Sequence, residues 1–168
     1  MAFDKDFPDL LEEHYPHLAR RGYTVRSPKT VQYNCFAWAA GDGRRWWEPG
    51  EDTYWPPGVG TNLTLESLMA AYATLGYRQC ASASRERGWE KIAIYIDELG
   101  PTHAARQRGN GVWTSKLGKD HDIDHQHLDA LEGPSYGKVA AYMKRPRKTR
   151  KRSRKPSRPR LSPRPQTG

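Results

Sequence analysis

The chain has 168 residues, with 28 Lys and Arg against 19 Asp and Glu, which gives a formal net charge of +9 at pH 7. This length suits one domain with extensions rather than two full domains. Residues 144–168 contain 12 of the basic residues and no acidic one, so residues 1–143 hold 16 bases and 19 acids. This distribution excludes a uniformly basic nucleic-acid-binding domain and indicates a slightly acidic domain followed by a cationic segment.

Further classes are excluded by features that the sequence lacks. No run approaches the roughly 18 apolar residues of a membrane-spanning helix, and the acidic start does not resemble a secretory signal. Two cysteines, Cys35 and Cys80, are too few for a disulfide framework, and no CxxC pair is present for zinc or redox chemistry. We therefore expect a reduced, cytoplasmic protein with no cofactor and no bound metal.

The beginning of the chain predicts two short helices joined by an extended connection. Residues 8–21 place apolar side chains at helical spacing, and residues 22–32 contain the Gly, Ser and Pro of a connecting segment. Asn34 is a typical N-cap residue, and Gly41 is a typical stop. We therefore expect a buried helix between them, with Cys35 in its first turn.

An aromatic loop at residues 42–61 is followed by an amphipathic helix at residues 64–76. Strands are predicted after that helix, at residues 77–83, 91–96, 102–107, 112–116 and 136–143. Asn110 and Gly111 supply a tight hairpin turn, and residues 118–135 are interpreted as a polar loop. This order predicts an α+β domain over residues 1–143, with N-terminal helices packed on a small antiparallel sheet.

Cys35 is the candidate nucleophile, because a thiol in the first turn of a helix lies near the positive end of the peptide dipoles. His103, at the start of a predicted strand, is the candidate base that such a thiol needs. His125 and Asp122 are the two alternatives for the group that orients the imidazole. Oxyanion-binding or supporting roles are assigned to Asn34, Ser115 and Lys116.

The same residue types also have structural interpretations. A free cysteine often packs as a small apolar side chain, and we interpret Cys80 in this way. The His and Asp residues within 119–127 suit divalent cations, but they lack a fixed ligand spacing and favour a solvated loop. Arg106 is expected at the surface or in an ion pair with a carboxylate.

Five phrases resemble a family of uncharacterised bacterial domains over about residues 30–143. They are YNCxAWA at 33–39, KIAxY at 91–95, PTHAARQ at 101–107, WTSKLG at 113–118 and DIxH at 122–125. The order of elements in this family is similar to that of papain-like thiol hydrolases. The resemblance implies a papain-like fold in which Cys35 attacks a carbonyl and His103 acts as the base. This sequence departs from the papain-like pattern because no third catalytic residue follows His103 directly.

Five tryptophans are candidates for lining a substrate cleft, namely Trp38, Trp46, Trp47, Trp55 and Trp113. For Trp46, Trp47 and Trp55, the alternative is that they fill the core between the helices. No export signal accompanies the predicted site, so an intracellular amide or thioester, either a small molecule or peptide-like, is the expected substrate.

The segment 144–168 is predicted to be a disordered tail, because it combines many cations and prolines with one large apolar residue, Leu161. Such a polycation attracts nucleic acid or an anionic surface without reading sequence. The cations assigned to this contact are Lys144, Arg145, Arg147, Lys148, Arg150, Lys151, Arg152, Arg154 and Lys155. The sequence thus predicts a thiol hydrolase or acyltransferase or, alternatively, a non-catalytic binding domain whose tail contacts nucleic acid non-specifically.

Overall fold

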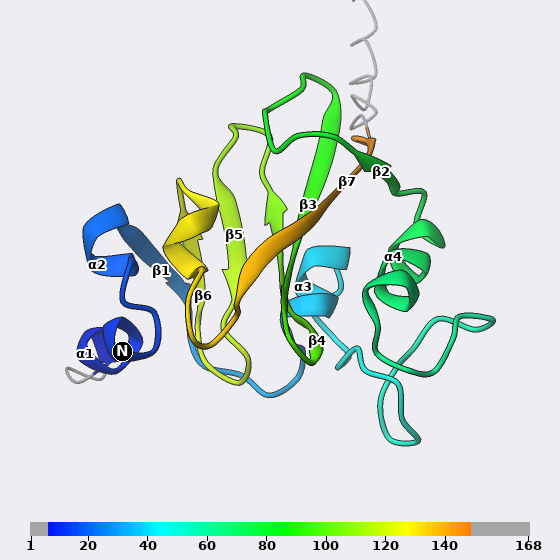
Figure 1. Ribbon diagram of the computed structural model, residues 1–168, viewed down its shortest axis with the longest axis horizontal. Coiled ribbons are helices and arrows are strands. Elements are labelled where there is room, and N and C mark those ends of the chain that lie inside the picture. The colour runs from blue at the N-terminus through cyan, green and yellow to red at the C-terminus, as the bar shows by residue number, and fades with distance from the viewer. Residues whose placement is uncertain (1–6, 149–168) are drawn as a thin grey trace, which may run out of the picture.

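The computed structural model describes residues 7–148. Its strands are β1 (Tyr23–Ser27), β2 (Arg78–Cys80), β3 (Trp89–Asp97), β4 (Gly100–Gln107), β5 (Trp113–Lys116), β6 (Asp122–His125) and β7 (Lys138–Pro146). The helices are α1 (Phe7–His14), α2 (Leu18–Arg21), α3 (Cys35–Ala40) and α4 (Leu65–Ala73), with the 3-10 turn η1 (Leu128–Leu131). The strands form one sheet in the order β1-β6-β5-β4-β3-β7-β2 (Figure 1), and every pair of neighbours is antiparallel.

This architecture corrects the expected papain-like fold. The protein is mostly a seven-stranded antiparallel sheet with a few short helices, rather than a group of helices packed on a small sheet. Part of the difference comes from two segments that were expected to be irregular. Residues 22–32 contain β1 and residues 118–135 contain β6, and these two strands pair with each other at one side of the sheet.

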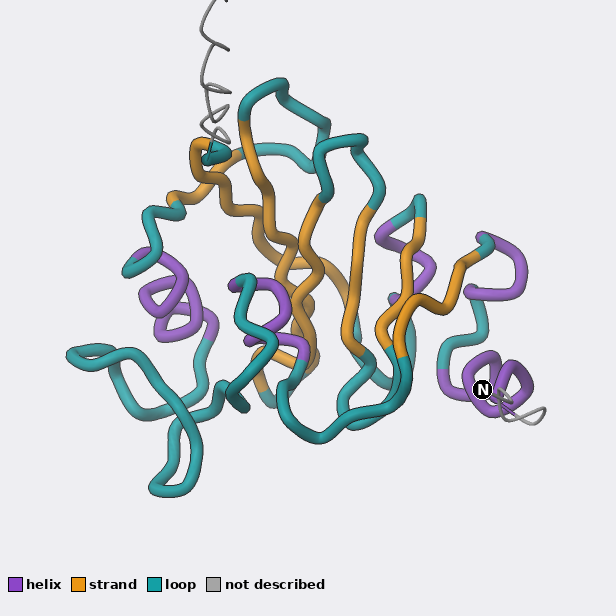
Figure 2. Tube along the Cα trace, turned by 180° about the vertical axis from the view of Figure 1, so that it is seen from behind, coloured by secondary structure: helices purple, strands orange, loops and turns teal. Residues whose placement is uncertain are grey.

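The two faces of the sheet are covered by different parts of the chain. We call the face that carries α3, α4 and the long loop 42–61 the helix-side face (Figure 2). On this face, α3, α4 and the loop pack against Ile92, Ile94 and Ala104. On the opposite face, the N-terminal helices and η1 pack against Ala93, Tyr95, Ala105, Trp113 and Ile123. The alternation along β3 and β4 follows from strand geometry, because successive side chains point to opposite faces.

The boundaries of α3 are confirmed as predicted. The side chain of Asn34 accepts a hydrogen bond from the backbone of Ala37 at 3.1 Å, which caps the helix, and its amide donates to the Trp47 carbonyl at 2.7 Å. Gly41 ends the helix with φ 81°, a left-handed conformation that glycine adopts without strain. Local signals in the sequence therefore determine where this helix lies.

Other predicted elements are confirmed with shifted ends. The helix predicted at 64–76 is α4, capped by Thr64, and the hairpin at 102–116 is formed by β4 and β5. The last strand, β7, continues to Pro146 and so includes Lys144 and Arg145, which were assigned to the tail. The rest of the predicted tail beyond Lys148 lies outside the described residues. Within residues 7–148, the structure has no helix that is long and apolar enough to cross a membrane.

Candidate functional site

Cys35 lies at the start of α3, where the sequence predicted it, but its side chain is buried in the core of the helix-side face. Only 6% of the residue is exposed, and it packs with Ala104 of β4 in that core. Burial raises the pKa of the Cys35 thiol to about 12, an effect larger than that of the backbone hydrogen bonds, which lower it. The sulfur is therefore held as a neutral thiol near neutral pH, in a place that solvent does not reach.

His103 lies on the other face of the sheet. It precedes Ala104, so its side chain points away from α3, and its ring stacks on Tyr136 at 4.2 Å and meets Tyr95 edge-on at 5.2 Å. Tyr95 belongs to the core of the opposite face. The structure thus places the sheet between Cys35 and His103, and the expected dyad is not formed.

His103 instead takes part in a buried chain of hydrogen bonds across β4, β5 and β6. Its Nε2 lies 2.9 Å from the Ser115 hydroxyl, which lies 2.8 Å from Nε2 of His125. Nδ1 of His125 lies 3.0 Å from the carbonyl oxygen of His127. Of the two residues considered as a third member, His125 is therefore connected to His103, through Ser115.

The hydrogen-bond partners fix the protonation of this chain. Burial lowers the pKa of His125 to about 4 and that of His103 well below its ordinary value, so both rings are neutral. A carbonyl oxygen can only accept, so His125 donates from Nδ1 to the His127 carbonyl and its unprotonated Nε2 accepts the hydroxyl proton of Ser115. The Ser115 oxygen then accepts a hydrogen bond from Nε2 of His103. Nδ1 of His103 is left without a partner among the described residues.

A serine that donates to a histidine is the first element of an activated hydroxyl nucleophile. Here, however, Ser115 and His103 have no exposed surface, and His125 is only 2% exposed. A carbonyl substrate has no access to the hydroxyl in this structure. We conclude that the chain of hydrogen bonds joins three strands and satisfies polar groups inside the core.

The remaining predicted site residues lie on the helix-side face. Lys116 and Asn34 are occupied by structural hydrogen bonds, and Oδ1 of Asp122 is buried without a hydrogen-bond partner among the described residues. Lys116 is buried and donates hydrogen bonds to the carbonyl oxygens of Thr30 at 2.9 Å and Gly118 at 2.6 Å. Asp122 is opposite Lys116 in the β5–β6 register and is 1% exposed. Asn34 is occupied as the helix cap. None of these three side chains faces His103.

The five tryptophans do not meet in one cleft. Trp47 is 2% exposed in the core of the helix-side face, and Trp113 is buried in the other core. Trp38 donates to the Thr114 hydroxyl, while Trp46 and Trp55 make hydrogen bonds within the loop that carries them. For Trp47, the structure therefore supports the alternative that it fills the core, and Trp113 is a core residue of the opposite face.

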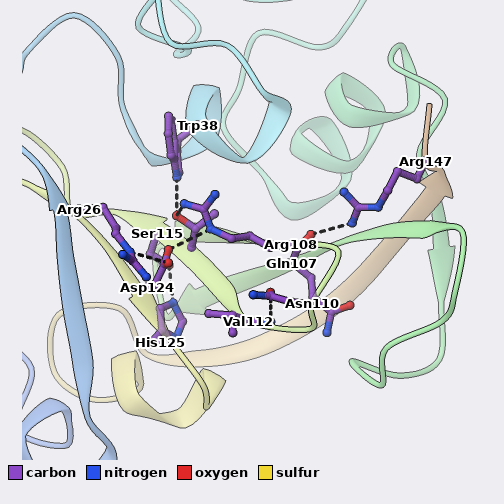
Figure 3. A network of polar contacts seen from close by, with 11 residues as sticks. Arg26, Trp38, Gln107, Arg108, Asn110, Val112, Ser115, Asp124, His125 and Arg147 are labelled. Carbon is purple, nitrogen blue, oxygen red and sulfur yellow. Dashed lines mark hydrogen bonds and ion pairs between the residues drawn. The ribbon is translucent and has the colours of Figure 1, made fainter. Parts of the chain in front are cut away.

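A cluster that was not predicted from the sequence lies on the helix-side face, formed by β1, β6 and the residue that follows β4 (Figure 3). The carboxylate of Asp124 accepts hydrogen bonds from Nε of Arg26 at 2.8 Å and Nε of Arg108 at 3.0 Å. The Asp124 side chain is 10% exposed, whereas those of Arg26 and Arg108 are 54% and 38% exposed. One buried acid thus positions two arginines that face solvent.

Two further carboxylates, those of Glu90 and Glu86, are each shared by two basic side chains. Glu90 contacts Arg106 at 3.9 Å and Arg145 at 3.5 Å, which agrees with the ion pair expected for Arg106. Glu86 contacts two lysines, Lys91 at 3.0 Å and Lys144 at 2.8 Å. Each of the three clusters keeps an excess of one positive charge.

These clusters adjoin further cations at the end of the sheet where β3 begins and β7 stops. We call this region the cationic end; beside the clusters it includes Arg78, Arg85, Arg87, Arg147 and Lys148. In the described part of the chain, these five side chains contact backbone oxygens, a tryptophan ring or solvent rather than carboxylates. Positive charge therefore collects at this end although residues 1–143 are acidic overall.

The sequence contains a signal for this arrangement, because residues two apart in a strand share a face. Arg106 and Arg108 have this spacing, and so do Asp122 and Asp124 in what was interpreted as a loop.

Within residues 7–148, the structure contains no group of three His, Cys, Asp or Glu side chains arranged to hold a metal ion.

Comparisons with known proteins give one match. Residues 24–144 match a family described as a domain of unknown function, DUF7689. No curated protein and no solved structure matches. The matched segment begins in β1 and ends in β7, so it includes all or most of every strand of the sheet, together with α3 and α4. The chain belongs to the DUF7689 family.

Proposed function

We propose that the protein is a non-catalytic binding domain that contacts nucleic acid through its cationic end and the basic segment that follows. The observation that carries this proposal is the set of three carboxylates, Asp124, Glu90 and Glu86, each shared by two bases. The shared acid holds its bases in place without neutralising both of them. At Asp124 both arginines reach solvent, whereas at Glu86 the Lys91 side chain is only 1% exposed and Lys144 is the base nearer the surface. A fixed excess of cations on a surface is what attracts a phosphate backbone.

The position of the cationic end in the chain supports the same proposal. Strand β7 brings Lys144 and Arg145 to this end of the sheet, and Arg147 follows directly after the strand. The sequence beyond Arg147 has nine further Lys and Arg residues and no acid. A polyanion bound at the sheet would therefore also be within reach of the segment that follows. The arrangement predicts binding to the phosphate backbone without sequence specificity.

The catalytic alternative has less support. A thiol hydrolase needs an ionised sulfur beside an imidazole in a cleft that is open to substrate. Cys35 is buried with a raised pKa, and His103 lies across the sheet from it. The binding function requires no rearrangement of the fold.

The proposal is tested by measuring the affinity of the full chain for duplex DNA at about 50 to 200 mM salt. One variant carries Arg78→Gln, Arg85→Gln and Arg87→Gln, and the matched control carries Arg20→Gln, Arg44→Gln and Lys138→Gln. Both sets remove three surface cations, but only the first set lies at the cationic end. A third variant replaces Arg150, Lys151, Arg152, Arg154 and Lys155 by Gln.

The slope of log affinity against log salt should become shallower by up to about 2.7 in the first variant, which is roughly 0.9 for each lost phosphate contact. The variant of residues 150–155 should also lose slope, whereas the control should retain it. Equal slopes for the first variant and the control, or no salt-dependent binding by the unmodified chain, would contradict the proposal.

A further inference from the structure

A surface pocket of about 210 Å³ lies beside the Asp124 cluster, between β1, β6 and the turn that joins β4 to β5. Its lining includes Arg21, Thr24, Arg26, Asn110, Asp124 and His125. Its volume is below the range of pockets that enclose a whole drug-sized ligand. The pocket therefore suits a single functional group rather than a complete nucleotide.

The one acid that lines this pocket is already occupied. Each oxygen of Asp124 accepts a hydrogen bond from an arginine Nε, one from Arg26 and one from Arg108. Arg21 likewise forms an ion pair with Asp129. Because the Asp124 carboxylate is neutralised from both sides, the pocket offers no free negative charge to a cation.

The polar groups left over around the pocket are mainly donors. Arg26 donates to Asp124 from Nε, and among the described residues no hydrogen bond of its two Nη groups is found. Asn110 accepts from the Val112 backbone through Oδ1, which leaves its amide nitrogen to donate. The hydroxyl of Thr24 is a further donor on the exposed side of β1. Several donors and a guanidinium fork match the oxygens of a tetrahedral anion.

We propose that this pocket binds a phosphate group, with the Arg26 fork as the main contact and Asp124 as the residue that positions it. The proposal deepens the proposed nucleic-acid binding, because a terminal phosphate of a strand and a free phosphate present the same chemistry. It differs from that function in requiring the geometry of one arginine rather than the summed charge of a surface.

The test compares a short single-stranded DNA that carries a 5′ phosphate with the same strand that ends in a 5′ hydroxyl. The full chain should bind the phosphorylated strand about tenfold more tightly, as expected when one charge-assisted pair of hydrogen bonds is added. Arg26→Gln should abolish this preference, and Arg26→Lys should weaken it, because lysine keeps the charge but not the fork. Arg44→Gln removes the same charge at an exposed position outside both the pocket and the cationic end, and it should retain the preference.

A titration with inorganic phosphate, followed by amide NMR shifts, distinguishes the source of the phosphate. Saturable shifts at Thr24 and Asn110 that Arg26→Gln removes, together with no 5′ preference, would support the pocket with a free phosphate as its ligand. No shift and no 5′ preference would overturn the inference. In that case the salt-dependent binding of the proposed function could still be intact, so the two proposals fail independently.

Discussion

Acid should destabilise the folded chain through the buried His125. Burial lowers its pKa from 6.5 to about 4. Between pH 6.5 and pH 4, the unfolded chain therefore binds a proton at this histidine and the folded chain does not. The stability that this histidine contributes is therefore fully present above about pH 6.5 and is lost as the pH falls toward 4. Such a loss follows from the fold and requires no ligand.

The size of the effect follows from the same two values. Each unit of pH below 6.5 removes about 1.4 kcal/mol from the free energy of unfolding, until the folded state also binds the proton. Near pH 5 the loss from His125 is roughly 2 kcal/mol, a large part of the stability of an ordinary domain. His103, whose pKa is also lowered by burial, adds to the slope in the same direction.

The assay is urea unfolding followed by tryptophan fluorescence, between about pH 5 and pH 7. Lower values are avoided because carboxylates with lowered pKa, such as those of Asp42 and Glu86, lose their contribution there. His125→Gln should reduce the pH slope by about 1.4 kcal/mol per unit. The reasoning is refuted if His125→Gln and the unmodified chain share one slope.

Two further predictions concern single residues. In the folded chain near neutral pH, an alkylating agent should modify the partly exposed Cys80 faster than the buried Cys35. Unfolding in urea should remove this difference. Faster modification of Cys35 in the folded chain would contradict the prediction and support a thiol hydrolase. Gly137→Ala should cost at least about 2 kcal/mol in thermal denaturation, because the new Cβ would lie 1.9 Å from the Ile96 carbonyl oxygen at a φ of 71°. Gly43→Ala, with open space around it, should be neutral; equal losses would contradict this account.

The sequence predicted those elements whose signals are local. The side chain of Asn34 and the left-handed Gly41 define α3 by contacts within a few residues, and the Asn110–Gly111 turn defines the hairpin of β4 and β5. Such contacts form between neighbours in the chain, so their residue types are visible in order. The register between distant strands has no comparable signature.

Strand β6 shows why the polar segment 118–135 was interpreted wrongly as a loop. All four residues of β6 are buried, although three of them are Asp or His. The burial of Asp124 and His125 is compensated because residues elsewhere in the chain supply partners, Arg26 and Arg108 for Asp124 and Ser115 for His125. Composition alone favours solvent exposure for such residues, and only the tertiary structure brings the compensating groups.

The candidate dyad depended on a choice of face that the sequence leaves open. Strand geometry requires that His103 and Ala104 point in opposite directions, so one of them must face α3 and the other must not. The small Ala104 lies against the helix that carries Cys35, and the larger His103 ring fits between Tyr95 and Tyr136 on the other face. A shift of one residue in register would exchange the two and expose His103 to the thiol. Packing of a short helix against a small side chain therefore decides between a catalytic pair and two separate cores.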